Sequence, residues 1–334
     1  MGDVLHAMPA VAALHEMHPE WQIGWVVEPR WLPLVKAARK GHAPLVDQTY
    51  LAATRDWKGR PVALRTLREI AALRRELRDG RFDLCVDMQG SIRSAVIGKM
   101  AGTKEFAGPD HPRERPARWL YGKQVRVSAA HVIEQGCELL GGAVGLPLRP
   151  AGVEFAIDDA VEQACDALLK RLLPGGERFV LLAPTAGWGA KQWPAERFGR
   201  VAAELGRQGY RTLVNASGAQ DATAQGVVRA SEGYAAAASG DLPQLIALTR
   251  RASLVIAGDT GPLHLAAALE RPVVALFGPT DPARNGPYGT QAKVLRHGGE
   301  RRDHRRLAEP EAGLLAITVD EVVEVAMEQL GRTR

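Results

Sequence analysis

The chain has 334 residues, of which 46% are hydrophobic and 24% are charged, values typical of a soluble globular protein. Its length predicts two domains, each able to bury a core of its own. No apolar run approaches the ~18 residues that span a bilayer, and no secretory signal is visible at the start. The three scattered cysteines, Cys85, Cys137 and Cys165, show no metal spacing and favour a reducing cytoplasm over a disulfide framework.

The charge is distributed unevenly along the chain. Residues 1–150 carry 22 Lys and Arg against 16 Asp and Glu, a formal charge of +6, whereas residues 151–334 carry 21 against 22. The basic side chains of the first half gather in two groups: Arg55, Lys58, Arg60, Arg65 and Arg68, then Arg113, Arg115, Arg118, Lys123 and Arg126. A basic half predicts an anionic partner, which is a phosphorylated lipid, a nucleic acid or a phosphosugar. The alternative, a solvated helix face with i,i+4 ion pairs, is preferred for the run from Arg68 to Arg81.

Short β-rich runs alternate with amphipathic stretches, which predicts an α/β fold with parallel sheets. In the first half we expect strands at 22–27, 43–49 and 84–87, and a helix over 65–78 with Leu67, Ile70, Leu73 and Leu77 at helical spacing. In the second half we expect strands at 179–183, 211–215, 253–257 and 272–277, and helices over 195–208, 219–230, 242–247 and 262–269. A capping box, Thr318-Val-Asp-Glu321, opens a last helix, and the Pro/Gly-rich stretch 145–152 is the expected linker.

The start of the chain lacks one expected element. Residues 2–6 are interpreted as a turn, 9–18 as a helix and 22–27 as a strand. A β-α-β unit needs a strand before that helix, and none is present. We therefore expect either a misassigned start codon or a first domain without a central strand. The former is favoured, because open ladder edges inside a sheet are a folding and aggregation liability.

The most informative segment runs from Leu254 to Leu269. An apolar run stops at Gly258-Asp259-Thr260-Gly261 and an amphipathic helix begins, so backbone N–H groups and the helix dipole favour a phosphate there. Thr260 adds a hydroxyl, His264 adds a ring nitrogen, and Gly261 allows an anion close to the backbone. A second strand ends in Gly278-Pro-Thr-Asp-Pro, and two such strand ends form a nucleotide-binding crevice. The alternative is that Asp259 and Thr260 only cap the helix and His264 is structural.

Three further segments carry candidate residues. Asp3 is either a helix N-terminal charge or a general base. Lys191 ends a Gly-rich loop, where it can neutralise a departing diphosphate or be merely solvated. In the same loop, Trp188 and Trp193 are either packing residues or part of the wall of a nucleotide or sugar site, and the sequence does not decide between these. The turn from Asp87 to Gly90 lines an acceptor pocket, or else Asp87 is a buried capping acid.

Several motifs together resemble one family. They are Gly2-Asp3-Val-Leu-His6-Ala-Met-Pro, Trp25-Val-Val-Glu28, Asp87-Met-Gln-Gly90, Lys191-Gln-Trp-Pro, Asp259-Thr-Gly-Pro-Leu-His264 and Gly278-Pro-Thr-Asp-Pro. The combination is similar to the bacterial lipopolysaccharide heptosyltransferases, family nine of the glycosyltransferases, and is closer to type I than to type II. Two departures are the absent apolar strand before the Gly-Asp turn and a loose match over 108–121.

The resemblance implies a GT-B architecture of two Rossmann-like domains facing across a cleft. The expected limits are 1–148 for the acceptor domain, 149–317 for the nucleotide-sugar domain, and 318–334 for a helix packing back toward the first domain. It also implies inverting, metal-independent transfer of heptose from ADP-heptose to Kdo of the lipopolysaccharide inner core, Kdo–lipid A, with no cofactor. Expected partners are the nucleotide-sugar donor and an anionic glycolipid acceptor, at the cytoplasmic face of the inner membrane, with peripheral contact and no nucleic acid.

The resemblance also assigns roles to residues. Asp3 is the expected catalytic base, and Lys191 assists the diphosphate. The expected donor-binding residues are Thr185, Lys191, Asp259, Thr260, Gly261 and His264; the expected acceptor-binding residues are Asp3, His6, Gln89 and Arg113, with no metal ligand.

Two other classes of function stay open on the sequence. One is another nucleotide-sugar enzyme of the same architecture, either an epimerase or a transferase for a different sugar. The other is a non-catalytic protein that binds an anionic partner through the basic half. A nicotinamide dehydrogenase is disfavoured because no Gly-x-Gly-x-x-Gly fingerprint follows a strand, and low aromatic content, 5%, disfavours nucleic acid.

Overall fold

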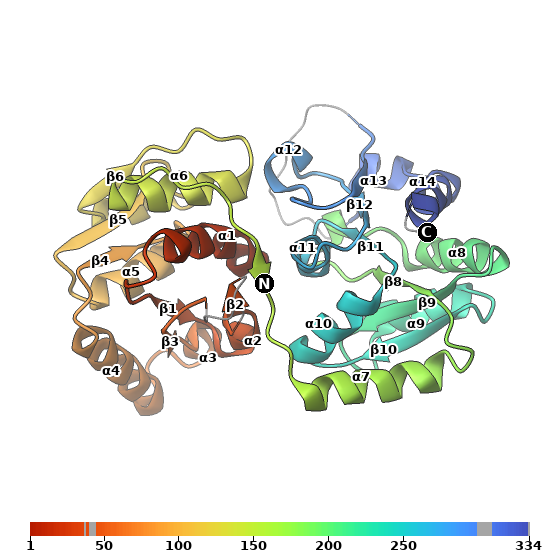
Figure 1. Cartoon of the computed structure of the whole chain (residues 1–334), viewed down its shortest axis with the longest axis horizontal. Coiled ribbons are helices and arrows are strands. Elements are labelled where there is room, and N and C mark those ends of the chain that lie inside the picture. Colours follow the sequence, from red (N-terminus) through yellow and green to blue (C-terminus); the bar gives the residue numbers. More distant parts are fainter. Residues whose placement is uncertain (37, 40–44, 299–308, 333–334) are drawn as a thin grey trace. The chain divides into compact units, whose positions relative to one another are not determined.

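The computed structural model describes residues 1–36, 38–39, 45–298 and 309–332 (Figure 1). The chain forms two compact units, Asp3–Ala156 together with Met1, and Ile157–Arg334. The N-terminal unit extends past the expected linker at 145–152 because β7 (Val153–Glu154) pairs antiparallel with β2 (Ala38–Arg39). Among the described residues, no helix has both the length and the apolar character needed to cross a bilayer.

The C-terminal unit is built on six parallel strands. They are β8 (Phe179–Ala183), β9 (Arg211–Ala216), β10 (Ala235–Ser239), β11 (Leu254–Gly258), β12 (Val273–Leu276) and β13 (Ala292–Leu295). Their spatial order is β10-β9-β8-β11-β12-β13, which is 3-2-1-4-5-6 in the chain order of this unit. This is the order of a doubly wound Rossmann sheet, whose direction of winding reverses between β8 and β11.

Helices cover both faces of this sheet (Figure 1). One face packs against α8 (Ala195–Arg207), α9 (Ala222–Ala230), α13 (Ala312–Ala316) and α14 (Val319–Arg332); the other packs against α7 (Asp159–Leu172), α10 (Leu242–Arg251) and α11 (Gly261–Ala268). The side chains of β8 alternate between the two layers: Val180 and Leu182 join the first core, and Leu181 and Ala183 join the second. Burial on both faces explains why this strand is a continuous apolar run.

The last helix, α14, belongs to the C-terminal unit by its contacts with α8, β11 and β12. Its Val322, Ala326 and Leu330 are fully buried in the first core. The expected capping box is confirmed, because the Thr318 and Glu321 side chains each accept a hydrogen bond from the other residue's backbone N–H. Packing of this helix toward the first domain stays a prediction.

The N-terminal unit holds two separate parallel sheets. β1 (Gly24–Val27) pairs with β3 (Gln48–Leu51), and β4 (Leu84–Val86), β5 (Glu105–Pro109) and β6 (Lys123–Val125) pair in that order. In the part of the chain that the structure describes, no strand joins β1 to β4. The helices are α1 (Gly2–Met17), α2 (Leu32–Val35), α3 (Thr54–Gly59), α4 (Leu64–Asp79), α5 (Ile92–Met100) and α6 (Val132–Val144). The 3-10 turns η1 (Pro29–Trp31) and η2 (Arg115–Leu120) complete this unit; η3 (Gly189–Lys191) and the short α12 (Pro282–Asn285) lie in the other.

Two expectations for the first fifty residues need correction. The turn expected over residues 2–6 is wrong: α1 is one helix from Gly2 onward, with Pro9 inside it. Pro9 removes one backbone hydrogen bond, but extensive burial, from Leu5 to Leu14, outweighs that cost. The strand expected at 43–49 begins at Gln48 instead, and residues 43 and 44 of that expectation lie outside the described residues.

Close packing of α8 on α9 depends on Gly199. A Cβ at this position would lie 2.4 Å from the Cβ of Ala230 and 2.7 Å from the backbone oxygen of Val227. We expect Gly199→Ala to lower the thermal unfolding midpoint, because overpacking costs about 1–3 kcal/mol and the backbone contact cannot yield easily. Gly331→Ala in α14, where nothing lies within 4 Å, is the matched control and should leave the midpoint unchanged or raised. Equal midpoints for the two variants would contradict this packing argument.

Candidate functional site

Lys191 and Asp259 meet where the winding of the C-terminal sheet reverses. Lys191 ends η3 in the loop after β8, and Asp259 follows β11, the hydrogen-bonded neighbour of β8. The Lys191 Nζ lies 2.5 Å from the Asp259 Oδ2 and 3.4 Å from the Asp259 backbone oxygen. At such a switch point, the loops from adjacent strand ends separate and leave room for a ligand. Two residues that lie 68 positions apart are thus brought into one cluster.

His264 completes this cluster. Its Nε2 donates to the Asp259 Oδ1 at 3.1 Å, so the Asp259 carboxylate accepts from both neighbours. Burial by itself raises the pKa of Asp259, but the His264 hydrogen bond and the Lys191 charge outweigh burial and hold it well below its usual range. The Lys191 ammonium also lies over the Trp188 ring, 4.6 Å from its centroid. The buried carboxylate is therefore an ionised counterion for Lys191.

The start of α11 has no side-chain cap. Thr260 is the N-cap residue, yet its hydroxyl donates to the backbone oxygen of Gly258 at 3.2 Å and makes no cap hydrogen bond. The two carboxylate oxygens of Asp259 accept hydrogen bonds from Lys191 and His264. The interpretation of Asp259 and Thr260 as mere helix caps is therefore wrong. With Gly261 at the first helical position, the opening turn keeps the backbone geometry that suits an anion.

Two threonines lie at neighbouring strand ends. Thr185 is exposed in the loop just after β8. Thr280, in the turn after β12, is 2% exposed, and its Oγ1 has no hydrogen-bond partner within the described residues. In the sequence, Thr280 was noted only as part of the Gly278-Pro-Thr-Asp-Pro motif. A buried hydroxyl without a partner is costly, so Thr280 is a residue that a ligand or water would satisfy.

The two tryptophans of the Lys191 loop have different surroundings. Trp193 is 1% exposed, packs edge-on against Phe198 and donates its indole N–H to the backbone oxygen of Ile317 at 3.2 Å. It is a core residue, which resolves the choice left open by the sequence. Trp188 is half-buried beneath the Lys191 ammonium.

In the N-terminal unit, three of the predicted acceptor residues come together. Asp3 lies in the first turn of α1, and the Gln89 Nε2 donates to its Oδ2 at 2.8 Å. The Arg113 guanidinium lies 3.7 Å from the same oxygen, and both side chains of this ion pair are 58% exposed. His6 lies one turn further along α1 and is half-buried. Asp3 therefore presents an accessible carboxylate that an amide and a guanidinium orient.

The turn that carries Gln89 is built around Asp87. This carboxylate is 5% exposed and accepts from the backbone N–H groups of Gln89 and Gly90, from the Ser94 hydroxyl, and from the Tyr121 hydroxyl at 2.7 Å. Asp87 is thus a buried acid that holds this turn, and the cap of the following helix is Ser91. Burial and the nearby Asp87 charge raise the pKa of Tyr121, which keeps the phenol as a donor.

No group of three metal-ligating side chains occurs among the residues that the structure describes. All three cysteines are free thiols. Burial raises the pKa of Cys85 to about 12 and that of Cys137 to about 11, so both remain protonated at neutral pH.

Comparison with known proteins identifies the family. The sequence profile of glycosyltransferase family 9 (heptosyltransferase) matches residues 70–312. The chain belongs to this family. Lipopolysaccharide heptosyltransferase 1 of Pseudomonas aeruginosa is 30% identical over 295 residues, covering 86% of this chain and 79% of that protein. The protein of the same name from Escherichia coli K12 is 28% identical over 308 residues, covering 89% and 90%.

Among solved structures, the E. coli heptosyltransferase WaaC with ADP matches with a TM-score of 0.78 at 24% identity, covering 98% of this chain and 97% of that one. The predicted α/β fold of the GT-B class is confirmed by this likeness, which is one of fold alone. The protein is a family 9 glycosyltransferase.

In the basic first half of this family 9 enzyme, hydrogen bonds join separate segments in a way that the sequence did not reveal. The Glu28 carboxylate accepts from the Thr54 hydroxyl and from the backbone N–H of Arg55, and Arg93 Nη1 donates to the Thr54 hydroxyl at 2.9 Å. Glu28 thereby holds the start of α3. No local pattern predicts this contact, because it joins three separate segments.

The ion pair of Asp259 predicts a pH-dependent stability. Asp259→Asn leaves the Lys191 ammonium, 12% exposed, without its carboxylate, and breaking such a pair costs about 3 kcal/mol at pH 7. Because the folded pKa of Asp259 is depressed, the contribution is complete above its unfolded value of about 4 and is lost as the pH falls below it. We expect the difference in free energy of unfolding between wild type and variant, measured in urea, to narrow below about pH 4.

Lys191→Met and the double variant Lys191→Met/Asp259→Asn provide the control. The coupling energy of this double-mutant cycle should be large at pH 7 and small in acid. A coupling energy that does not change with pH would show that Asp259 is not a depressed carboxylate.

Proposed function

We propose that this glycosyltransferase moves heptose from ADP-heptose to Kdo of the lipopolysaccharide inner core, by an inverting displacement without a metal ion. The names of the relatives supply the substrate class: both curated relatives described above are lipopolysaccharide heptosyltransferases 1. E. coli WaaC was solved with ADP and with ADP-2-deoxy-2-fluoro heptose. The observation that carries the proposal is the cluster of Lys191, Asp259 and His264 at the switch point of the C-terminal sheet.

The donor diphosphate binds at this cluster. An ammonium group has three donors, and Lys191 directs two of them at Asp259. The third is available to a phosphate oxygen and can stabilise the charge that develops on the departing ADP. The opening turn of α11 adds the backbone N–H of Gly261 and the positive end of the helix dipole, whereas Pro262 has no N–H and those of Leu263 and His264 bond to the Thr260 backbone oxygen. Thr185 and Thr260 supply hydroxyls to the same donor.

The acceptor hydroxyl is activated by Asp3. The Asp3 carboxylate takes the proton as the acceptor oxygen forms a bond to C1 of heptose, and the bond from C1 to the phosphate oxygen breaks with its electron pair leaving on ADP. Attack opposite the leaving group inverts the anomeric carbon. Gln89 and Arg113 hold the carboxylate by the contacts described above, and Arg113 also favours an anionic acceptor. His6 lies one turn from this base and lines the same acceptor region.

The acceptor is an anionic glycolipid, so we place the enzyme at the cytoplasmic face of the inner membrane as a peripheral protein without a nucleic-acid partner. The formal charge of +6 over residues 1–150 supports attraction to such a surface. No cofactor takes part in the proposed displacement.

The test is ADP release from ADP-heptose with and without Kdo–lipid A. We expect release only with the acceptor, unchanged by a chelator, and a product whose anomeric configuration is opposite to that of the donor. Release without an acceptor would favour an epimerase or hydrolase. Retained configuration, or loss of activity with the chelator, would contradict the inverting or metal-independent part of the proposal.

Asp3→Asn tests the proposed base. A general base contributes about 10²–10⁴-fold, so we expect kcat to fall by that factor while the affinity for ADP, measured calorimetrically, is unchanged. Glu16→Gln on the exposed side of the same helix is the matched control and should leave kcat unaltered. Equal kcat values for Asp3→Asn and wild type would remove Asp3 from the mechanism.

A further inference from the structure

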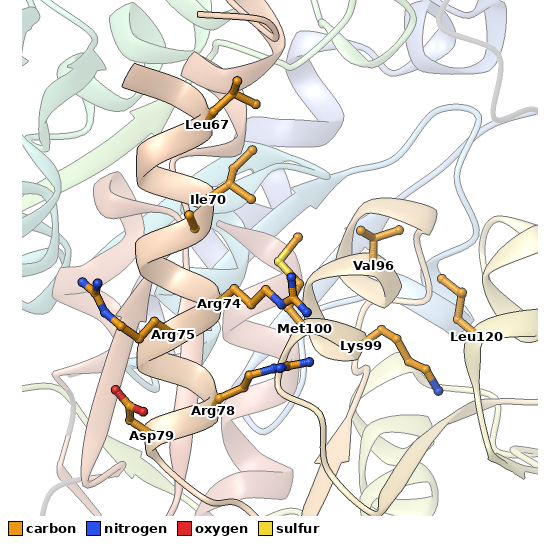
Figure 2. Close-up of a pocket in the computed structure, with 11 residues that line it drawn as sticks. Leu67, Ile70, Arg74, Arg75, Arg78, Asp79, Val96, Lys99, Met100 and Leu120 are labelled. Atoms are coloured by element: carbon orange, nitrogen blue, oxygen red, sulfur yellow. The ribbon is translucent and has the colours of Figure 1, made fainter. Parts of the chain in front are cut away.

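A groove of about 760 Å³ lies between α4 and α5 of the N-terminal unit, with η2 at its edge (Figure 2). Its lining includes Leu67, Ile70 and Arg74 from α4, and Val96, Lys99 and Met100 from α5. None of these residues belongs to the candidate site. The chemistry of the groove therefore calls for a separate explanation.

The apolar part of the groove includes half of the apolar stripe of α4. Of the four apolar residues at helical spacing on α4, Leu73 and Leu77 are buried, whereas Leu67 is 54% exposed. On α5, Val96 is 43% exposed. Exposing two aliphatic side chains in one groove is unfavourable in water, so this part of the groove suits an apolar partner.

The charged part of the groove is strongly basic. Four cations, Arg74, Arg75, Arg78 and Lys99, line it against one carboxylate, Asp79. The ion pairs expected along this helix face are absent from the described structure, except for Arg65 with Glu69 one turn before the groove. These four cations therefore keep their charge available for an anion.

The apolar and basic side chains are graded along the groove. Figure 2 shows Leu67 and Ile70 toward one end, Arg78 and Lys99 toward the other, and Val96 at an intermediate level. From Leu67 to Arg78 the helix rises roughly 16 Å. An aliphatic end next to a basic end matches an amphiphile with an anionic headgroup.

We propose that the α4–α5 groove docks the enzyme on a bilayer that contains anionic phospholipid. Leu67 and Val96 enter beneath the headgroups, and Arg74, Arg78 and Lys99 bind the phosphates, with long basic side chains reaching to the headgroup layer. The choice of a bilayer over an acidic protein rests on the proposed glycolipid acceptor.

The fold links this groove to the acceptor turn. α5 begins at that turn, where Ser91 and Ser94 form its capping box and the Ser94 hydroxyl donates to Asp87. The helix begins at Ile92, just after the turn that presents Gln89, so Lys99 lies about 10 Å along the axis from that start. Docking at the groove therefore holds the acceptor turn near the headgroups, where a glycolipid displays its sugars.

The test is cosedimentation with phosphatidylcholine vesicles that do or do not contain phosphatidylglycerol. We expect binding to the anionic vesicles only, weakening with salt. Each basic residue near an anionic surface contributes about a fivefold gain, so Arg74→Ser/Arg78→Ser/Lys99→Ser should reduce the partition coefficient by about 100-fold. Lys170→Ser/Arg171→Ser/Arg200→Ser removes the same charge from exposed positions of the C-terminal unit and should bind as wild type does.

A second variant addresses the apolar end. Leu67→Gln/Val96→Gln keeps every charge and should weaken vesicle binding even at the salt concentration where the electrostatic part is screened. The proposal is overturned if the triple groove variant binds as tightly as its control, if wild type binds neither vesicle, or if inorganic phosphate at constant ionic strength displaces the vesicles. Displacement by inorganic phosphate would mean that the groove is a site for free phosphate. Binding to neither kind of vesicle would favour an acidic protein partner.

Transfer to a water-soluble Kdo acceptor without acyl chains separates this proposal from the proposed function. The groove variants should keep this transfer at the wild-type rate, because none of their residues belongs to the candidate site. Vesicle binding without transfer by the wild type would leave the docking groove standing and reject the proposed substrates. Transfer without vesicle binding would support the proposed substrates and reject the docking groove.

Discussion

The buried carboxylate of Asp259 is the constraint on which the candidate site of the C-terminal unit depends. An ionised group at 5% side-chain exposure is tolerated only when it is paired, and both of its oxygens are used, by Lys191 and by His264. This pairing fixes the loop after β8 against the helix after β11. The same loop also passes close to the end of β11, because a Cβ on Gly258 would lie 3.2 Å from the Lys191 backbone oxygen.

The N-terminal unit is held together differently from the C-terminal unit. In the C-terminal unit, β8 bonds to strands on both sides and makes one continuous sheet. In the N-terminal unit, β1-β3 and β4-β5-β6 are separate, and the turn after β4 depends on the four hydrogen bonds that Asp87 accepts. Tyr121 supplies one of these from beyond β5, beside Gly108, where any Cβ would lie 2.4 Å from the phenol ring. The turn that carries Gln89 is thus shaped by hydrogen bonds to the Asp87 side chain.

The sequence predicts best what local chemistry decides. Strands buried on both faces, such as β8 and β11, are predicted to within a residue because their apolar runs end at clear turn signals. β10 was missed because its sequence, Ala-Ala-Ala-Ala-Ser, has little strand propensity, and pairing with β9 creates it. β5 was missed for the same reason, since Gly108 and Pro109 lie within it. The helix α4 was predicted, but the exposure of its Leu67 depends on which neighbours pack against it.

In the candidate site, too, local motifs could be predicted from the sequence, whereas contacts between distant residues could not. Turn motifs predicted Asp259 and Lys191 as separate candidates, because a Gly-rich turn after a strand has a local signature. That they form an ion pair across 68 residues follows from the strand order, which no local pattern encodes. The contact of Gln89 with Asp3 spans 86 residues and escaped prediction for the same reason.

The surroundings of Asp3 and Asp259 separate two tasks that one carboxylate cannot perform. Asp259 is enclosed by the Lys191 ammonium and the His264 ring, which hold its pKa down and make it a buried counterion. Asp3 is exposed and has one amide and one distant guanidinium, so its second oxygen remains accessible to a substrate proton. A base needs access, whereas a counterion needs enclosure, and pairs of acids in contrasting environments are how a fold assigns such roles. Because Asp259 already neutralises Lys191, the proposed diphosphate would gain from this cluster mainly through a directed Lys191 N–H and the backbone N–H of Gly261. Such fixed donors require little reorganisation as charge develops on the leaving group.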